Sequence, residues 1–165
     1  PTFVDMDAPA HTQQRGLVEP SFDLAAVRTP AMRSLIQTEI DAALKNFKQK
    51  GDKGAVVDFN TEFAQPVVTN IIYHILGIPH RDQDYLNQCN AVRTSASATS
   101  GEAASANKDL VAYLHRLVES KAASEPTNDF ISTLVHKHVR AGELDMEDAA
   151  QVTFLMLVAG NATVV

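Results

Sequence analysis

The sequence lacks tryptophan, multiple cysteines and long apolar runs, the last two of which would mark a disulfide-rich or a membrane protein. Its 165 residues include no tryptophan and a single cysteine, Cys89. One cysteine cannot form an intrachain disulfide, and it cannot supply a zinc site built from several thiolates. The longest mainly apolar run, residues 152–159, is much shorter than the roughly 20 residues that a membrane-spanning helix needs. A disulfide framework and a membrane span are therefore excluded.

Positive charge is also scarce. Fourteen Lys and Arg residues face twenty Asp and Glu residues, which gives a net charge of −6, and the basic residues are scattered. A nucleic-acid surface needs them gathered, so that class of partner is not expected. No secretory signal opens the chain, and it carries no phosphate-binding loop, nucleophile elbow or zinc-hydrolase motif. The length suits one domain, and the composition is that of a soluble globular protein.

Apolar residues recur at three- and four-residue spacing along most of the chain, which predicts an all-α fold of about seven helices. Polar residues suited to N-caps precede several of these helices, namely Asp7, Thr29, Asp129 and Asp145. Residues 55–59 are the only segment predicted to form a strand, and it is a short one.

The last predicted helix follows Asp145 and becomes apolar on every side after Gln151, so we expect protein all around it. It contains Gly160, Asn161 and Thr163. Glycine inside a helix costs about 1 kcal/mol relative to alanine, and buried Asn and Thr need partners. Two interpretations are open for this interruption of the apolar helix. Either a ligand approaches the backbone at Gly160, or a second helix packs against Gly160 while Thr163 bonds back to a carbonyl one turn earlier.

His11 and Arg15 lie four residues apart, so they share a helix face and could together bind one carboxylate. They could equally be an ordinary solvated pair. His136 and His138 are two apart and would point in different directions on a helix, which argues against a metal site.

Two motifs together resemble the haem-thiolate family, the cytochromes P450. The stretch from Asp7 to Arg15 resembles D-x-P-x-H-x-x-x-R at the start of helix C in that family. The stretch from Ala159 to Thr163 resembles the A-G-x-[D/E]-T segment of helix I, which crosses the distal haem face. The resemblance covers the chain from helix C to the middle of helix I.

The resemblance implies a single partial domain, residues 1–165, truncated at both ends. The N-terminal sheet region, the E-x-x-R motif and the loop with the haem-ligating cysteine are expected to be missing. We therefore expect no metal ligand in this chain, and no activity from it alone.

One departure narrows the resemblance. Ala162 stands where the family usually has Asp or Glu, an acid that helps to deliver protons for splitting dioxygen. Residues 3–7, 90–94 and 158–163 are similar to the fungal nitric oxide reductase branch. That branch uses haem b, takes hydride directly from NADH or NADPH without a separate reductase protein, and converts nitric oxide to nitrous oxide. The expected compartment is the cytoplasm or the mitochondrion.

The resemblance also implies roles for single residues. His11 and Arg15 would bind the haem propionates. In the distal segment, Thr163 would relay protons or order the nicotinamide. Gly160 would let the cofactor approach the backbone, and Asn161 would support local hydrogen bonding.

Three further residues are expected to bind cofactor. Ala159 opens the segment that crosses the haem face. Arg93 would meet the dinucleotide pyrophosphate, and Asp5 would help to organise the same channel. Two alternatives remain: an ordinary hydroxylating member of the family, and a free-standing helical binding module.

Overall fold

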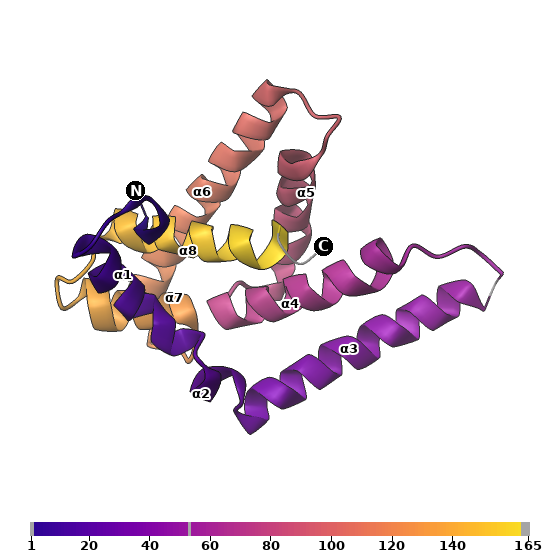
Figure 1. Ribbon diagram of the computed structural model, residues 1–165, viewed down its shortest axis with the longest axis horizontal. Helices are drawn as coiled ribbons and strands as arrows, with labels where there is room; N and C mark the ends of the chain where they lie inside the picture. The colour runs from indigo at the N-terminus through magenta and orange to yellow at the C-terminus, as the bar shows by residue number, and fades with distance from the viewer. Residues whose placement is uncertain (1, 53, 163–165) are drawn as a thin grey trace.

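The computed structural model describes residues 2–52 and 54–162, with side chains described as far as Asn161. Within them the fold is all-α, as predicted, with eight α-helices and five short 3-10 or π segments (Figure 1). The α-helices are α1 (Ala10–Val18), α2 (Leu24–Val27), α3 (Pro30–Gly51), α4 (Gln65–Leu76), α5 (Gln83–Thr94), α6 (Ser100–Ala122), α7 (Phe130–Thr133) and α8 (Met146–Ala162). The 3-10 segments are Phe3–Asp5, Glu19–Ser21 and His80–Asp82, and the π segments are Asn60–Ala64 and Leu134–Val139.

Three of the four predicted N-caps are confirmed. The side chains of Thr29, Asp129 and Asp145 each accept a hydrogen bond from a backbone N–H three residues on, at 3.2, 2.9 and 2.7 Å. The prediction for Asp7 is wrong. Its backbone carbonyl, not its carboxylate, accepts the N–H of His11 at 3.0 Å, because the helix begins later, after Pro9.

The structure has one α-helix more than the sequence predicts, and this is α2. It is a single turn, too short to show an apolar period. Its start is marked by Asp23, whose carboxylate accepts the N–H of Ala26 at 2.8 Å.

The predicted strand at residues 55–59 is wrong. Residues 55–58 are irregular, and Phe59 leads directly into the π segment before α4. The Asp58 carboxylate accepts the Thr61 N–H at 2.7 Å, which starts a helical turn in place of a strand. Val56 is fully exposed, and no strand occurs among the described residues for this segment to pair with.

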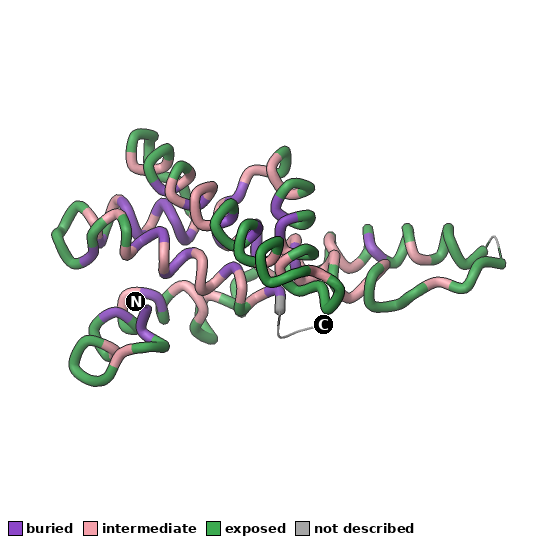
Figure 2. The backbone as a smooth tube through the Cα atoms, turned by 90° about the horizontal axis from the view of Figure 1, so that it is seen from above, coloured by how far each residue is buried: buried purple, intermediate pink, exposed green. Residues whose placement is uncertain are grey.

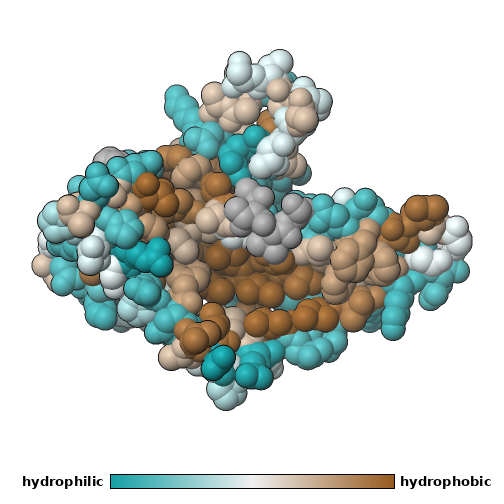
Figure 3. Space-filling view, viewed as in Figure 1, coloured by the Kyte–Doolittle hydropathy of each residue, from teal (hydrophilic) through white to brown (hydrophobic). Residues whose placement is uncertain are grey.

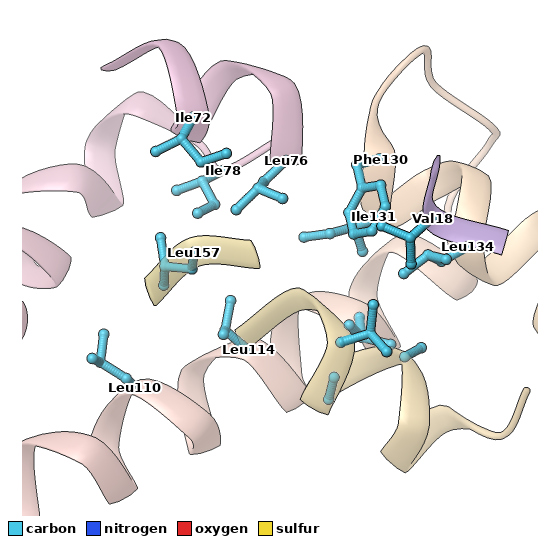
Figure 4. Close-up of a cluster of buried hydrophobic side chains, with 14 of the residues drawn as sticks. Val18, Ile72, Leu76, Ile78, Leu110, Leu114, Phe130, Ile131, Leu134 and Leu157 are labelled. Carbon is cyan, nitrogen blue, oxygen red and sulfur yellow. The ribbon is translucent and has the colours of Figure 1, made fainter. Parts of the chain in front are cut away.

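The core lies where α4, α6 and α8 meet (Figure 1). Figure 4 shows Ile72 and Leu76 of α4, Leu110 and Leu114 of α6, and Leu157 of α8 converging on one another. Apolar stripes at helical spacing supply these contacts, and burying each such side chain contributes about 1.5–3 kcal/mol. Gly77 ends α4 with a φ of 83°, a conformation that glycine adopts without strain.

The helix α3 is packed much less closely than the others of its length. Only Ala43 is buried along its 22 residues, and Figure 2 shows it projecting as a mostly exposed arm. The hydrophobic surface in Figure 3 extends over the facing sides of α3 and α4. None of the helices in the described part of the chain has the length and apolar character that crossing a membrane requires.

Candidate functional site

The two sides of α8 near its C-terminal end have different surroundings. Leu157 and Asn161 are one turn apart and are 2% and 6% exposed, on the side that packs against α4. Gly160 also meets α4. A Cβ placed on Gly160 would lie 2.7 Å from Cγ1 of Ile72, closer than real Cβ contacts come. This side therefore requires glycine for helix–helix packing, one of the two interpretations that the sequence left open.

Asn161 is held to α4 by hydrogen bonding. Its Oδ1 accepts the hydroxyl of Thr69 at 2.8 Å, and its Nδ2 donates to the Leu157 carbonyl at 3.1 Å. Thr69 is 5% exposed, so this polar pair is fully inside the protein. Because buried polar groups are costly when unpaired, the two bonds account for an asparagine in an apolar helix.

The opposite side of α8 is more open. Met156 is half-buried and Ala159 is exposed, and at a spacing of three residues they share one helix face. We call this face, defined by Met156 and Ala159, the open side of α8. Met156 and Arg15 of α1 line one pocket of about 190 Å³, together with Phe3, Val18, Glu19, Phe22 and Asp23. Met156, on the open side of α8, therefore shares a pocket with Arg15, which is predicted to bind cofactor.

His11 and Arg15 are on α1, as predicted. The His11 ring lies edge-on to that of Phe3, with centroids 6.2 Å apart, and Arg15 is exposed. In the part of the chain that the structure describes, neither side chain has a hydrogen-bond or ion-pair partner. A guanidinium and an imidazole one turn apart are thus available to anionic groups such as carboxylates.

Arg93 is in the last turn of α5 and is half-buried. Its Nε and Nη2 both donate to Oδ1 of Asn90, at 3.2 and 2.9 Å. Burial lowers the pKa of the guanidinium, which nevertheless remains charged at neutral pH. Figure 1 shows α5 and α1 well apart, so Arg93 does not join the pocket of Arg15.

Two further predicted site residues are Asp5 and Thr163. Asp5 is exposed in the 3-10 segment before α1, and its carboxylate accepts the Thr2 hydroxyl at 3.4 Å. Thr163 lies outside the described residues. Its predicted role stays a prediction.

Sequence reasoning missed Thr69. It lies inside an apolar stripe of α4, and its partner Asn161 is 92 residues away. A buried threonine within such a stripe was the available signal, but the pairing itself depends on how α4 and α8 cross.

No family model matches the chain. It is 44% identical over 165 residues to cytochrome P450 55A3 of Fusarium lichenicola, covering 100% of this chain and 40% of that protein. It is 33% identical over 163 residues to cytochrome P450-SU2 of Streptomyces griseolus, covering 99% and 38%. The structure superposes on the mycinamicin VIII C21 methyl hydroxylase MycCI of Micromonospora griseorubida with a TM-score of 0.84 and 26% identity, covering 99% and 40%. It belongs to the cytochrome P450 family.

The solved structure of GfsF, a further P450 homologue, gives a TM-score of 0.84 at 30% identity, covering 99% of this chain and 39% of that one. The chain thus spans about 40% of the length of the P450 proteins that it matches. Within the family, its identity to the Fusarium protein, 44%, exceeds the 28% and 33% shared with two Streptomyces members. The predicted resemblance to the P450 family and to its fungal branch is confirmed.

Proposed function

We propose that this chain is the central portion of a haem-thiolate enzyme that reduces nitric oxide with NADH or NADPH. In the overall reaction, two nitric oxide molecules, one NAD(P)H and one proton yield nitrous oxide, NAD(P)⁺ and water. The N-terminal sheet region and the cysteine loop that ligates the haem iron would belong to the rest of the parent protein, and the chain alone would be inactive.

The residues on α1 fit a haem. Haem b carries two propionate carboxylates, and His11 and Arg15 offer donors on one face without a partner in the described structure. Arg15 also lines a pocket with Met156, where a carboxylate would meet the guanidinium beside hydrophobic surface. The wall of this pocket is mixed, because Glu19 and Asp23 line it as well. When bound, the haem supplies the site at which nitric oxide is reduced. His11 and Arg15 would hold the propionates and so fix the orientation of the ring.

The open side of α8 would face the distal pocket, since Met156 on that side lines the same pocket as Arg15 of α1. The hydroxyl of Thr163 would relay protons or order the nicotinamide. Arg93 would bind the dinucleotide pyrophosphate with the donors that Asn90 does not use, and Asp5 would help to organise the channel. Asn161 would support local hydrogen bonding from its place against α4.

One observation carries the proposal: the distal segment reads Ala159-Gly160-Asn161-Ala162-Thr163, with alanine where hydroxylating members carry an acid. An enzyme that splits no dioxygen has no use for that acid. The identity to a fungal P450 supports the same choice.

The test is an anaerobic assay of the purified full-length parent, with NADH or NADPH and nitric oxide, and with no reductase protein added. We expect one nitrous oxide for each NAD(P)H oxidised. No turnover until a reductase partner and dioxygen are supplied would reject the proposal.

A second candidate is an ordinary monooxygenase. It is favoured by the fold shared with MycCI, whose name describes a methyl hydroxylase, and by identity to Streptomyces P450 proteins. This candidate predicts dioxygen uptake and a hydroxylated organic product. The third alternative, a free-standing helical module, is less well supported, because the chain matches inside proteins more than twice its length.

A further inference from the structure

The contact between α4 and α8 is polar at one buried point. The Thr69 hydroxyl donates to Asn161 Oδ1 at 2.8 Å, and both residues are more than nine-tenths buried. Elsewhere the facing sides of these helices are largely apolar, with Ile72, Leu76 and Leu157 in one cluster. A single hydrogen bond in such a surface restricts both sliding and rotation of one helix against the other.

Asn161 passes this restraint on to the backbone of α8. Its Nδ2 donates to the Leu157 carbonyl, one turn earlier on the same helix. Gly160, next to it, lies so close to Ile72 that there is no room for a Cβ. The segment 157–161 is therefore located by α4 through one bond and one close contact. As a result, Ala159 faces away from α4, on the open side.

We propose that Thr69 is a positioning residue for the distal segment of α8. It acts through its hydrogen bond to Asn161, which precedes Thr163 by two positions in the sequence. Thr69 sets the rotation of α8, and with it the direction in which Ala159 and the groups beside it face the distal pocket. This inference rests on the proposed function.

The test compares Thr69→Val with Thr69→Ser in the full-length, haem-loaded parent. Valine keeps the shape and removes the hydroxyl, whereas serine keeps the hydroxyl. Small misplacements of reacting groups can cost up to about 10²-fold in rate, and we expect kcat for nitric oxide reduction to fall about tenfold in Thr69→Val. The KM for NAD(P)H and the haem content should not change. Thr69→Ser should keep the kcat of the unaltered parent. Equal kcat in all three proteins would overturn the proposal.

A second readout does not depend on nitric oxide reduction. The infrared stretch of carbon monoxide bound to the reduced haem responds to the geometry of distal groups, so it should shift in Thr69→Val and return in Thr69→Ser. Thr153→Val is the matched control, because the Thr153 hydroxyl is equally buried but bonds to Ala149 within α8. The control should leave the stretch unchanged.

The outcomes separate the two claims. A lowered melting temperature with an unmoved carbon monoxide stretch would make Thr69 merely structural and would overturn the inference. A shifted stretch in a parent without nitric oxide reductase activity would retain the positioning role and reject the proposed function. Should Thr69→Val not fold, Thr69→Ala replaces it and should shift the stretch in the same way.

Discussion

The two sides of α8 illustrate how one helix can carry two different constraints. On the side toward α4, Gly160 and Asn161 are fixed by packing and by a buried hydrogen bond. On the open side, Met156 lines a pocket with Arg15, and Ala159 is exposed. Glycine and asparagine inside a helix are unfavourable by themselves, so their presence on one side is explained by α4. The exposure of Ala159 on the other side fits the proposed haem.

The largest expected effect concerns the open side and α1. Replacing both His11 and Arg15 by glutamine in the parent should lower haem affinity about 10²- to 10⁴-fold, since each charge-assisted bond contributes about 1.5–3 kcal/mol. The melting temperature of the haem-free parent should change little, because neither side chain has a hydrogen-bond or ion-pair partner in the described structure and only the edge of the His11 ring meets Phe3. Haem transfer to a competing acceptor measures the affinity.

Arg33→Gln provides the control for that experiment. Arg33 is also an exposed arginine, but it lies on α3. A loss of haem equal to that of the double variant would show that reduced positive charge, and not binding by α1, explains the effect.

A smaller effect is expected from the packed side. Gly160→Ala would place a Cβ 2.7 Å from Cγ1 of Ile72, and overpacking of this kind costs about 1–3 kcal/mol. Alanine also gains about 1 kcal/mol over glycine inside a helix, so the free energy of unfolding of the haem-free parent, measured with urea, should fall by up to about 2 kcal/mol. Gly101→Ala is the matched control, since nothing but the Thr99 hydroxyl lies within 4.0 Å of its added Cβ.

A second substitution sharpens the interpretation of Gly160→Ala. If the clash with Ile72 is the cause, adding Ile72→Ala, which removes the clashing Cγ1, should recover part of the loss, so the two changes should not be additive. Strict additivity would show that Gly160 is required for another reason, such as approach of the cofactor to the backbone.

The smallest effect concerns pH and the core of α4. Burial raises the pKa of the Tyr73 hydroxyl, which donates to Asn87 at 2.9 Å. In the unfolded chain this hydroxyl ionises near pH 10, whereas in the folded protein it stays neutral to higher pH. Its contribution to stability is therefore complete below about pH 10 and is lost as the pH rises toward the folded pKa. Urea unfolding between pH 8 and 11 should show a shallower decline in Tyr73→Phe, and an unchanged decline would contradict this account.

The sequence predicted those parts of the fold that depend on local chemistry. Thr29, Asp129 and Asp145 start helices because their side chains bond to N–H groups only three residues away. The His11 and Arg15 pair follows from helix periodicity in the same way. Residues 55–59 show the limit of such reasoning, because a strand also needs a partner, and none lies among the described residues.

The rest of the site depended on contacts between distant segments. Gly160 admitted two interpretations until Ile72 was seen against it. The role of Thr69 could not be predicted, because one threonine in an apolar stripe does not show which residue of another helix it will contact. The orientation of α8 against α4 determines both what Gly160 packs against and which residue Thr69 meets. No local sequence pattern predicts that orientation.

A crystal structure of the haem-loaded parent would test the central claim most directly. The account predicts Arg15 at a propionate and Ala159 against the haem face, with Asn161 still bonded to Thr69 and away from the ring. Asn161 in contact with the haem or with bound dinucleotide, and Ala159 turned toward α4, would contradict it.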